Sequence, residues 1–473
     1  MRLVVINILI MKIIIHYFRS SPTRIFILSF FLLIVVGSVL LILPPSTYNG
    51  INPIDALFTS TSAVCVTGLT VVNTHTCFTL FGQTIIMLLI QIGGLGIFTF
   101  ASYFSFSLKK SSSYENQIAL WNITNARTLG GVFNTLKQTI TITLLVESIG
   151  ACLIFSSIDA KLIPSLFDRI YISIFHSISA FCNAGFSTLE NGIMEVGFLH
   201  NYPFQLSLIF LFIFGGLGFP LVSNLLKYFK YCINRIFNKV IFDKNLYKPW
   251  ILSLESKINI YTIVFLILGG TVFLLLNEYN TVLESHSGVG KFVTALFTAT
   301  TPRTAGFNTI DFSQLHMASI LVIILLMWIG ASPSSTGGGI KTSTFAVAIL
   351  NIISLGRGKS HIEIFNRQIA NVTVRRAFAI ITLSLILIGT GVALISYFDN
   401  HLKCIDIIFE CFSAYSTVGL TLGITTEVSI PSKIVLISLM FIGRVSVLTF
   451  FISFFKKPDK DTYTYPIEEI LIN

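Results

Sequence analysis

Four short loops, each with a central glycine, have the residue types and spacing of a binding site. They read Val66-Thr67-Gly68-Leu69-Thr70, Asn183-Ala184-Gly185-Phe186-Ser187, Thr304-Ala305-Gly306-Phe307-Asn308 and Thr417-Val418-Gly419-Leu420-Thr421. None of these residues is charged, as expected of a site that coordinates through neutral carbonyls rather than through Asp or Glu. Glycine adopts positive φ readily, which lets neighbouring carbonyls point toward one axis. Because carbonyl rings replace the water that a potassium ion sheds, the loops predict a potassium filter.

The expected potassium ligands are the three residues of each loop up to and including its glycine. They are Val66, Thr67 and Gly68; Asn183, Ala184 and Gly185; Thr304, Ala305 and Gly306; and Thr417, Val418 and Gly419. The fourth loop is close to the TVGYG filter of potassium channels. Any one loop is a common pattern, whereas four glycines 113 to 121 residues apart indicate an internal repeat. The seven cysteines form no CxxC pair, so no transition-metal site is expected.

A short helix is expected just before each loop. A phenylalanine lies nine or ten residues ahead of each glycine, at Phe58, Phe175, Phe297 and Phe409. A helix of about 12 residues covers about 18 Å, which is about half the thickness of a bilayer. Such a helix enters the membrane without crossing it, and the chain must return to the side from which it came.

Long apolar runs flank each short helix and predict eight spanning helices. They lie near residues 25–43, 79–106, 134–158, 204–228, 257–277, 315–355, 373–397 and 432–455. The expected fold is an all-α membrane protein of four M1–P–M2 pore-loop repeats with pseudo-fourfold symmetry, where P is the short helix. The repeats cover 25–106 (filter 66–70), 134–230 (filter 183–187), 257–356 (filter 304–308) and 373–455 (filter 417–421). An N-terminal segment (1–24) and a tail (456–473) flank them.

Composition and charge exclude a soluble enzyme and a nucleic-acid-binding protein. Of the 473 residues, 53% are hydrophobic and only 11% charged, against roughly a quarter charged in soluble domains. The net charge is +10, but its placement alternates: one set of gaps between apolar runs holds 23 Lys and Arg and the other set holds five. The positive-inside rule puts the rich set, and with it both termini, in the cytoplasm. We therefore expect a multi-pass protein of the cell membrane, with the lipid bilayer as partner and no nucleic acid.

The apolar run from 315 to 355 is about twice the length of one span, and glycines and a proline interrupt it. A continuous helix through them costs about 1 kcal/mol per Gly and about 3 for Pro, so a loop at 331–341 is expected at membrane depth. Such a loop must line a cavity or be buried in protein. We interpret it as a gate carried by Gly337, Gly338, Gly339 and Lys341.

Two arginines lie inside apolar or loop segments. Arg444 in the last span is expected to face inward and to bind carbonyls or hydroxyls of the gate loop. An electrostatic barrier to cations and a structural cap are both open interpretations of Arg444. Arg303, beside the third filter loop, is expected to brace that loop by hydrogen bonds.

These features together resemble the Ktr/Trk/HKT superfamily of potassium transporters. The resemblance rests on the four loops, on SPSSTGGGIKT at 332–342 and on Gly443-Arg444. It implies potassium coordination near Gly68, Gly185, Gly306 and Gly419, and a gate at 331–341. With a single span ahead of the first loop, the chain looks like a Ktr-type membrane subunit. That type implies a homodimer on a cytosolic ring of nucleotide-binding regulatory subunits, with the nucleotide on the partner and no cofactor in this chain. The family tends to have Gly-Pro soon after the last arginine, where this chain has Val445-Ser446-Val447.

Two other function classes remain as alternatives. A cation-coupled secondary transporter would need buried carboxylates within its spans, and Glu147 is the plain example. A membrane enzyme would need grouped catalytic residues, but His176 has none beside it in sequence. Acidic residues just outside the loops, Glu190, Asp311 and Glu427, either attract cations to the mouth or are ordinary solvated loop charges.

Overall fold

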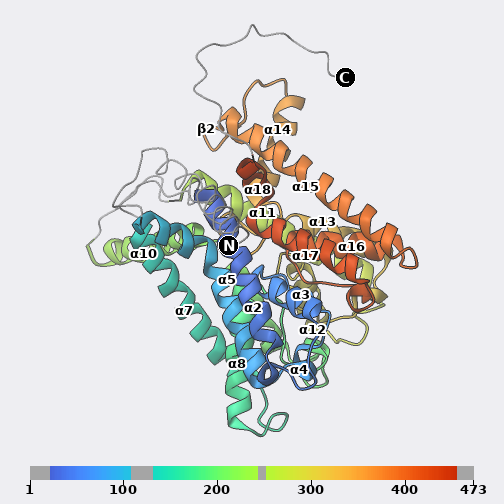
Figure 1. Cartoon of the computed structure of the whole chain (residues 1–473). Helices are drawn as coiled ribbons and strands as arrows, with labels where there is room; N and C mark the ends of the chain where they lie inside the picture. Colours follow the sequence, from blue (N-terminus) through green and yellow to red (C-terminus); the bar gives the residue numbers. More distant parts are fainter. Residues whose placement is uncertain (1–21, 108–131, 243–251, 455–473) are drawn as a thin grey trace.

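A computed structural model describes residues 22–107, 132–242 and 252–454, and these residues are mostly helical (Figure 1). The sheet found among them is a short antiparallel pair, β1 (Glu363–Ile364) with β2 (Arg367–Gln368). Most of the expected N-terminal segment (1–24) and all of the expected tail (456–473) lie outside the described residues.

The helices follow one another in four units along the chain. Unit 1 contains α2 (Pro22–Ile42), α3 (Pro53–Val64), α4 (Thr74–Cys77) and α5 (Leu80–Ser107). Unit 2 contains α7 (Val132–Ser157), α8 (Leu166–Cys182), α9 (Tyr202–Leu217) and α10 (Phe219–Phe242). Unit 3 contains α11 (Leu254–Glu278), α12 (Val289–Thr300), α13 (Met317–Trp328) and α14 (Thr342–Gly356). Unit 4 contains α15 (Asn371–Phe398), α16 (Cys404–Ser416), α17 (Ile430–Val445) and α18 (Val447–Phe454).

One short helix in each unit precedes the glycine loop. Helices α3, α8, α12 and α16 have 12, 17, 12 and 13 residues. At 1.5 Å per residue they are about 18–26 Å long, less than the hydrocarbon core of about 30 Å. Their starts are marked in the sequence: α3 begins with Pro53, and the Ser165 hydroxyl accepts the backbone N–H of Asp168 to cap α8.

Three described helices are long and apolar enough to cross a bilayer by themselves, namely Lys137–Ser157, Leu254–Glu278 and Asn371–Phe398. Counting each of two sharply bent pairs as one span raises the number to five among the described residues. The remaining apolar helices are shorter, including Phe26–Ile42 and Leu80–Gly96. The arrangement with eight spans therefore stays a prediction.

Two of the expected spans are bent rather than continuous. The predicted span 204–228 turns by 104° between α9 and α10, and the predicted span 432–455 turns by 93° between α17 and α18. The residues at the turns, Gly218 and Ser446, have φ of +81° and +76°. Positive φ ends a right-handed helix, and Pro220 provides no N–H donor for the first turn of α10. Apolar content alone concealed both bends.

Glycines let three long helices touch the ends of the short ones. A Cβ on Gly93, Gly215 or Gly443 would overlap a backbone carbonyl oxygen of the short helix in its own unit. The oxygens belong to Val64, Phe181 and Tyr415, each four residues before a loop glycine. The glycine-rich stretches at 93–96 and 215–218 therefore pack closely against the short helices that precede the glycine loops.

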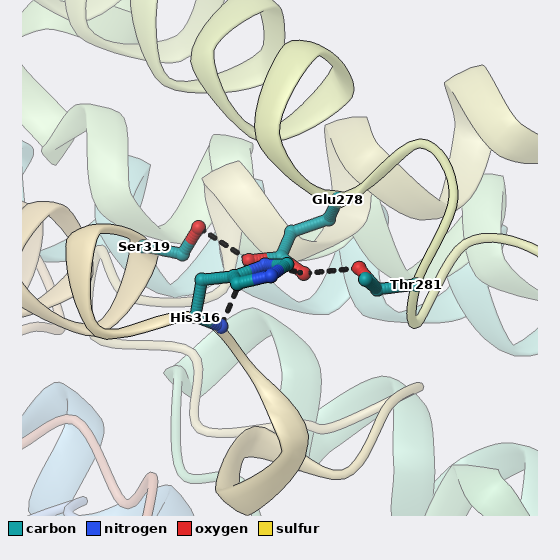
Figure 2. Close-up of polar contacts among 4 residues, drawn as sticks. All are labelled: Glu278, Thr281, His316 and Ser319. Atoms are coloured by element: carbon teal, nitrogen blue, oxygen red, sulfur yellow. Dashed lines mark hydrogen bonds and ion pairs between the residues drawn. The ribbon is translucent and has the colours of Figure 1, made fainter.

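In units 3 and 4, a buried carboxylate at the end of the first helix accepts hydrogen bonds from the start of the helix that follows the glycine loop. Figure 2 shows Glu278, at the end of α11, accepting hydrogen bonds from Ser319 Oγ (2.5 Å), Thr281 Oγ1 (2.5 Å) and the backbone nitrogen of His316 (3.1 Å). Asp399, just after α15, accepts the backbone nitrogen and the hydroxyl of Ser429, both at 3.0 Å. His316 and Ser429 are the residues that precede α13 and α17. Glu278 thus links the end of α11 to the start of α13, and Asp399 links the end of α15 to the start of α17.

Candidate functional site

The four loops share one unusual backbone conformation. The first expected ligand of each loop has positive φ, namely Val66 (57°), Asn183 (60°), Thr304 (73°) and Thr417 (51°). The glycine two residues later is also positive, namely Gly68 (94°), Gly185 (69°), Gly306 (76°) and Gly419 (90°). A left-handed conformation costs a non-glycine residue about 1–2 kcal/mol. Its recurrence at four equivalent positions indicates that the shape of the loops, rather than local preference, decides the backbone there.

The loops meet in a closed ring. A Cβ built on each glycine would strike the carbonyl oxygen of the residue before the glycine in the next unit. The pairs are Gly68 with Ala184 at 2.5 Å, Gly185 with Ala305 at 3.0 Å, Gly306 with Val418, and Gly419 with Thr67. Unit 1 faces unit 2, unit 2 faces unit 3, unit 3 faces unit 4, and unit 4 returns to unit 1. Residues spread over 352 positions of sequence therefore surround a single axis.

Hydroxyl groups of the short helices hold the loops from behind. In units 1 and 4 the backbone N–H of Gly68 and Gly419 donates to Ser62 Oγ (3.0 Å) and Ser413 Oγ (3.1 Å). In units 2 and 3 the hydroxyls of Ser179 and Thr301 donate to the carbonyls of Phe186 (2.8 Å) and Phe307 (2.6 Å). These four hydroxyls lie five or six residues before the loop glycines, and all are buried. The Ser and Thr residues that recur in this part of each repeat therefore hold the backbone of the glycine loop in place.

A cavity of about 200 Å³ opens on one side of the ring. All four loop glycines line it, together with polar side chains such as Thr70 and Asn308. Glu190 is the one charged residue among the described residues that line it. Of the three acidic residues considered from the sequence, Asp311 and Glu427 are not part of the lining.

The run 315–355 is broken as its glycines predicted, between α13 and α14. The backbone of the intervening loop is held by the open end of α9: Ser332 N donates to the Gly216 carbonyl (3.0 Å) and Thr336 N to the Gly215 carbonyl (3.4 Å). These carbonyls are available because α9 ends at Leu217 and lacks a following turn. The bend between α9 and α10, which the sequence did not predict, thus leaves free the carbonyls that bind the loop.

The same loop lies directly against the third and fourth glycine loops. The backbone N–H of Gly338 donates to Thr417 Oγ1 at 2.9 Å, and a Cβ on Gly337 would overlap the hydroxyl of Thr304. Thr304 and Thr417 are the first expected ligands of the third and fourth loops. Lys341 Nζ donates to the Gly337 carbonyl at 2.5 Å. A side chain larger than hydrogen at 337 or 338 does not fit without moving Thr304 or Thr417.

Arg444 joins the loop at 331–341 to unit 1. The residue is 3% exposed, and its guanidinium donates to the carbonyl of Thr336 and to that of Gly93 (2.6 Å). The predicted partner, a carbonyl of the loop, is confirmed. The bond to Gly93 could not be predicted, because nothing in the sequence links positions 351 residues apart. Arg303 donates to the Gly330 carbonyl at 3.4 Å, which ties the segment before the third glycine loop to the residue just before the loop at 331–341.

A further buried acid that was not singled out from the sequence lies beside the fourth glycine loop. Glu410 lies in α16, fully buried, and accepts a hydrogen bond from Thr425. Thr425 in turn bonds Thr421, the last residue of the fourth loop, at 2.9 Å. A carboxylate in the middle of the apolar segment IIFECF was the available signal. Glu147, which the sequence did single out, accepts Gln91 Nε2 at 3.2 Å and is 6% exposed.

Apolar helices that carry four inward loops, closed into a ring of carbonyls, are the architecture of a membrane transport protein. The chain matches the TrkH family model, described as a cation transport protein, over residues 16–465. This chain therefore belongs to the TrkH family of cation transport proteins and is not an enzyme.

Its similarity to characterised relatives extends over nearly the whole chain. It is 37% identical over 459 residues to Ktr system potassium uptake protein B of Bacillus subtilis, covering 97% of this chain and 98% of the relative. It is 34% identical over 464 residues to the potassium/sodium uptake protein NtpJ of Enterococcus hirae, covering 96% and 98%. The crystal structure of the potassium transporter TrkH from Vibrio parahaemolyticus superposes with a TM-score of 0.69 at 20% identity, covering 91% of this chain and 83% of that one. This last comparison supports the fold alone.

Proposed function

We propose that this chain is the potassium-translocating membrane subunit of an uptake system in the cell membrane. The observation that carries the proposal is the closed ring in which each loop glycine abuts a carbonyl of the next unit. Relatives of nearly equal length are named as potassium uptake proteins, which supports potassium as the ion. In this proposal the four units are M1–P–M2 repeats with eight spans and both termini in the cytoplasm.

Potassium enters through the cavity above the ring and loses water to the loop carbonyls. The ligands in this proposal are the twelve residues named from the sequence, with the carbonyls of Thr67, Ala184, Ala305 and Val418 nearest the neighbouring glycines. Because the short helices end at the ring, their partial negative charges face the ion. Each such end favours a cation by about 0.3–1 kcal/mol at an exposed site.

The intramembrane loop acts as the gate in this proposal. It rests against Thr304 and Thr417, so an ion that leaves the ring toward the cytoplasm meets it at once. Lys341 and Arg444 hold its carbonyls and put positive charge beside the path. Deletion of residues 335–339 is expected to raise potassium flux, and an unchanged or lower flux in a folded variant contradicts the gating role.

Control of the gate is assigned to a separate cytosolic subunit. Three relatives are named as parts of a Ktr system, which supports a multi-subunit assembly. We infer a homodimer on a ring of nucleotide-binding regulatory subunits, with the nucleotide on the ring.

Potassium uptake in a bacterial strain without its own importers tests the function. Growth at low potassium should require this chain and increase when the ring subunit is co-expressed. Because one relative is named for potassium and sodium, the same cells are assayed with and without sodium. Expression of correctly inserted protein without any gain in potassium uptake, with or without the ring subunit, would refute the proposal.

A further inference from the structure

Helix α10 leaves the bundle sideways. Its axis turns by 104° from that of α9 at Gly218, so α10 runs nearly perpendicular to α9. In Figure 1, α10 runs across the view whereas α7 runs down it. The start of α10 is fixed: Leu221 and Val222 are buried, and Asn224 Nδ2 donates to Ser256 Oγ at 3.0 Å. Beyond this anchor the helix departs from the core.

The departing part of α10 exposes an apolar stripe. Leu226, Phe229 and Ile233 are spaced three and four residues apart, which sets them on one face. Their exposed fractions are 53%, 59% and 65%. Residues of this size at this spacing are normally buried against another element. This stripe has no covering helix among the described residues.

Basic residues border the stripe on the same helix. Lys227, Lys230 and Arg235 are exposed, and the whole of α10, from 219 to 242, contains no Asp or Glu. The segment from 227 to 257 holds seven Lys and Arg, more than any other gap between apolar runs. Long basic side chains beside an apolar stripe reach a polar layer while their stems stay in an apolar one.

We propose that α10 lies in the cytoplasmic leaflet as an interfacial helix that binds anionic phospholipid headgroups. Its apolar stripe enters the acyl region, and Lys227, Lys230 and Arg235 meet the headgroup phosphates. The right-angled exit from a spanning helix, the exposed stripe and the absence of acidic residues all fit this partner. An acidic protein surface would complement the charges but does not account for the stripe or for its depth at the end of a span. The assignment of the leaflet rests on the proposed orientation; lipid binding does not.

Spin labels on the full chain in liposomes of phosphatidylcholine and phosphatidylglycerol locate α10 directly. The seven native cysteines are replaced first, and labels are placed by Phe229→Cys, Ile233→Cys and Lys230→Cys. The first two labels should be accessible to oxygen and shielded from a water-soluble nickel chelate, and the label at 230 should be accessible to the chelate. Leu276→Cys on α11 (78% exposed) gives the value for a membrane-facing site, and Val196→Cys (92% exposed) gives the value for water.

Two results overturn the proposal. Accessibility of both apolar positions to the chelate, as at Val196, would mean that α10 lies in water. Shielding from both oxygen and the chelate would mean that protein, such as a second copy of the chain, covers the stripe. Neither result bears on potassium uptake, so failure here is distinct from failure of the proposed function.

A second measurement keeps the native cysteines. Phosphatidylglycerol added to phosphatidylcholine nanodiscs should raise the melting temperature of the chain. In Lys227→Gln/Lys230→Gln the affinity for the headgroups should fall roughly 25-fold, about fivefold per charge, so the phosphatidylglycerol content needed for half of this effect should rise. Lys161→Gln, an exposed lysine outside α10, serves as control and should leave it unchanged. An equal requirement in the double variant and the parent would remove the support for headgroup binding.

Discussion

Replacement of Gly68 by Ser should reduce the preference for potassium over sodium without preventing insertion of the protein. A Cβ at this position would lie 2.5 Å from the Ala184 carbonyl oxygen. Ordinary contact begins near 3.4 Å, so that carbonyl must retreat by about 0.9 Å. The backbone at 68 also has φ of +94°, which costs an L-residue about 1–2 kcal/mol. If the backbone relaxes and potassium binding weakens by the same 1–2 kcal/mol, the preference for potassium over sodium falls roughly 5- to 30-fold.

Competition between potassium and sodium in an uptake assay measures the effect. Two matched substitutions separate its causes. Gly50→Ser has a similar positive φ of +78° with open space around it, and Gly389→Ser has open space without positive φ. Both should keep the parental preference. A parental preference in Gly68→Ser, or an equal loss of preference in Gly50→Ser, would contradict the proposed effect of the contact with Ala184.

Three further predictions concern the elements that support the ring. In Arg444→Gln the Thr336 carbonyl loses its charged donor, a loss of about 1.5–3 kcal/mol, so uptake by the inserted chain should rise; unchanged uptake would favour a purely structural arginine. Gly443→Ala should reduce the amount of folded protein recovered in detergent, because its Cβ overlaps a backbone carbonyl, whereas Gly356→Ala, with open space, should not; equal recovery would contradict the packing. Burial opposes ionisation of Asp399, but hydrogen bonds to its carboxylate outweigh this and hold the pKa below its usual value. The resulting stability is present above about pH 4 and is lost as the pH falls through the lower folded-state pKa, so the melting temperature of Asp399→Asn should be lower at neutral pH and converge with the parent in acid.

The local features of the site followed from residue chemistry. Glycine and proline at 330–339 predicted the break in the third unit, since no continuous helix accommodates them at low cost. A charge in an apolar span needs a partner, which was sufficient to predict that Arg444 binds the loop. In both cases a large local energy cost leaves few possible structures, and the residues that cause the cost can be recognised in the sequence.

Features that depend on how distant segments meet were not predictable in the same way. The bends at Gly218 and Ser446 come from single positive φ values within runs that are apolar on both sides. The clamp on Glu278 joins a helix end to a helix start 38 residues later, and neither end looks unusual by itself. The pattern of apolar residues indicates which segments are buried, but it does not indicate the direction in which each helix runs. For this reason the seat of the intramembrane loop on α9 emerged only with the three-dimensional arrangement.

The most direct test of the account is to locate the bound ion. Crystals of the protein grown in rubidium or thallium, which substitute for potassium, give an anomalous signal at each occupied site. The account predicts a peak on the axis enclosed by the carbonyls of Thr67, Ala184, Ala305 and Val418. An empty ring, with anomalous density only at other positions, would contradict it.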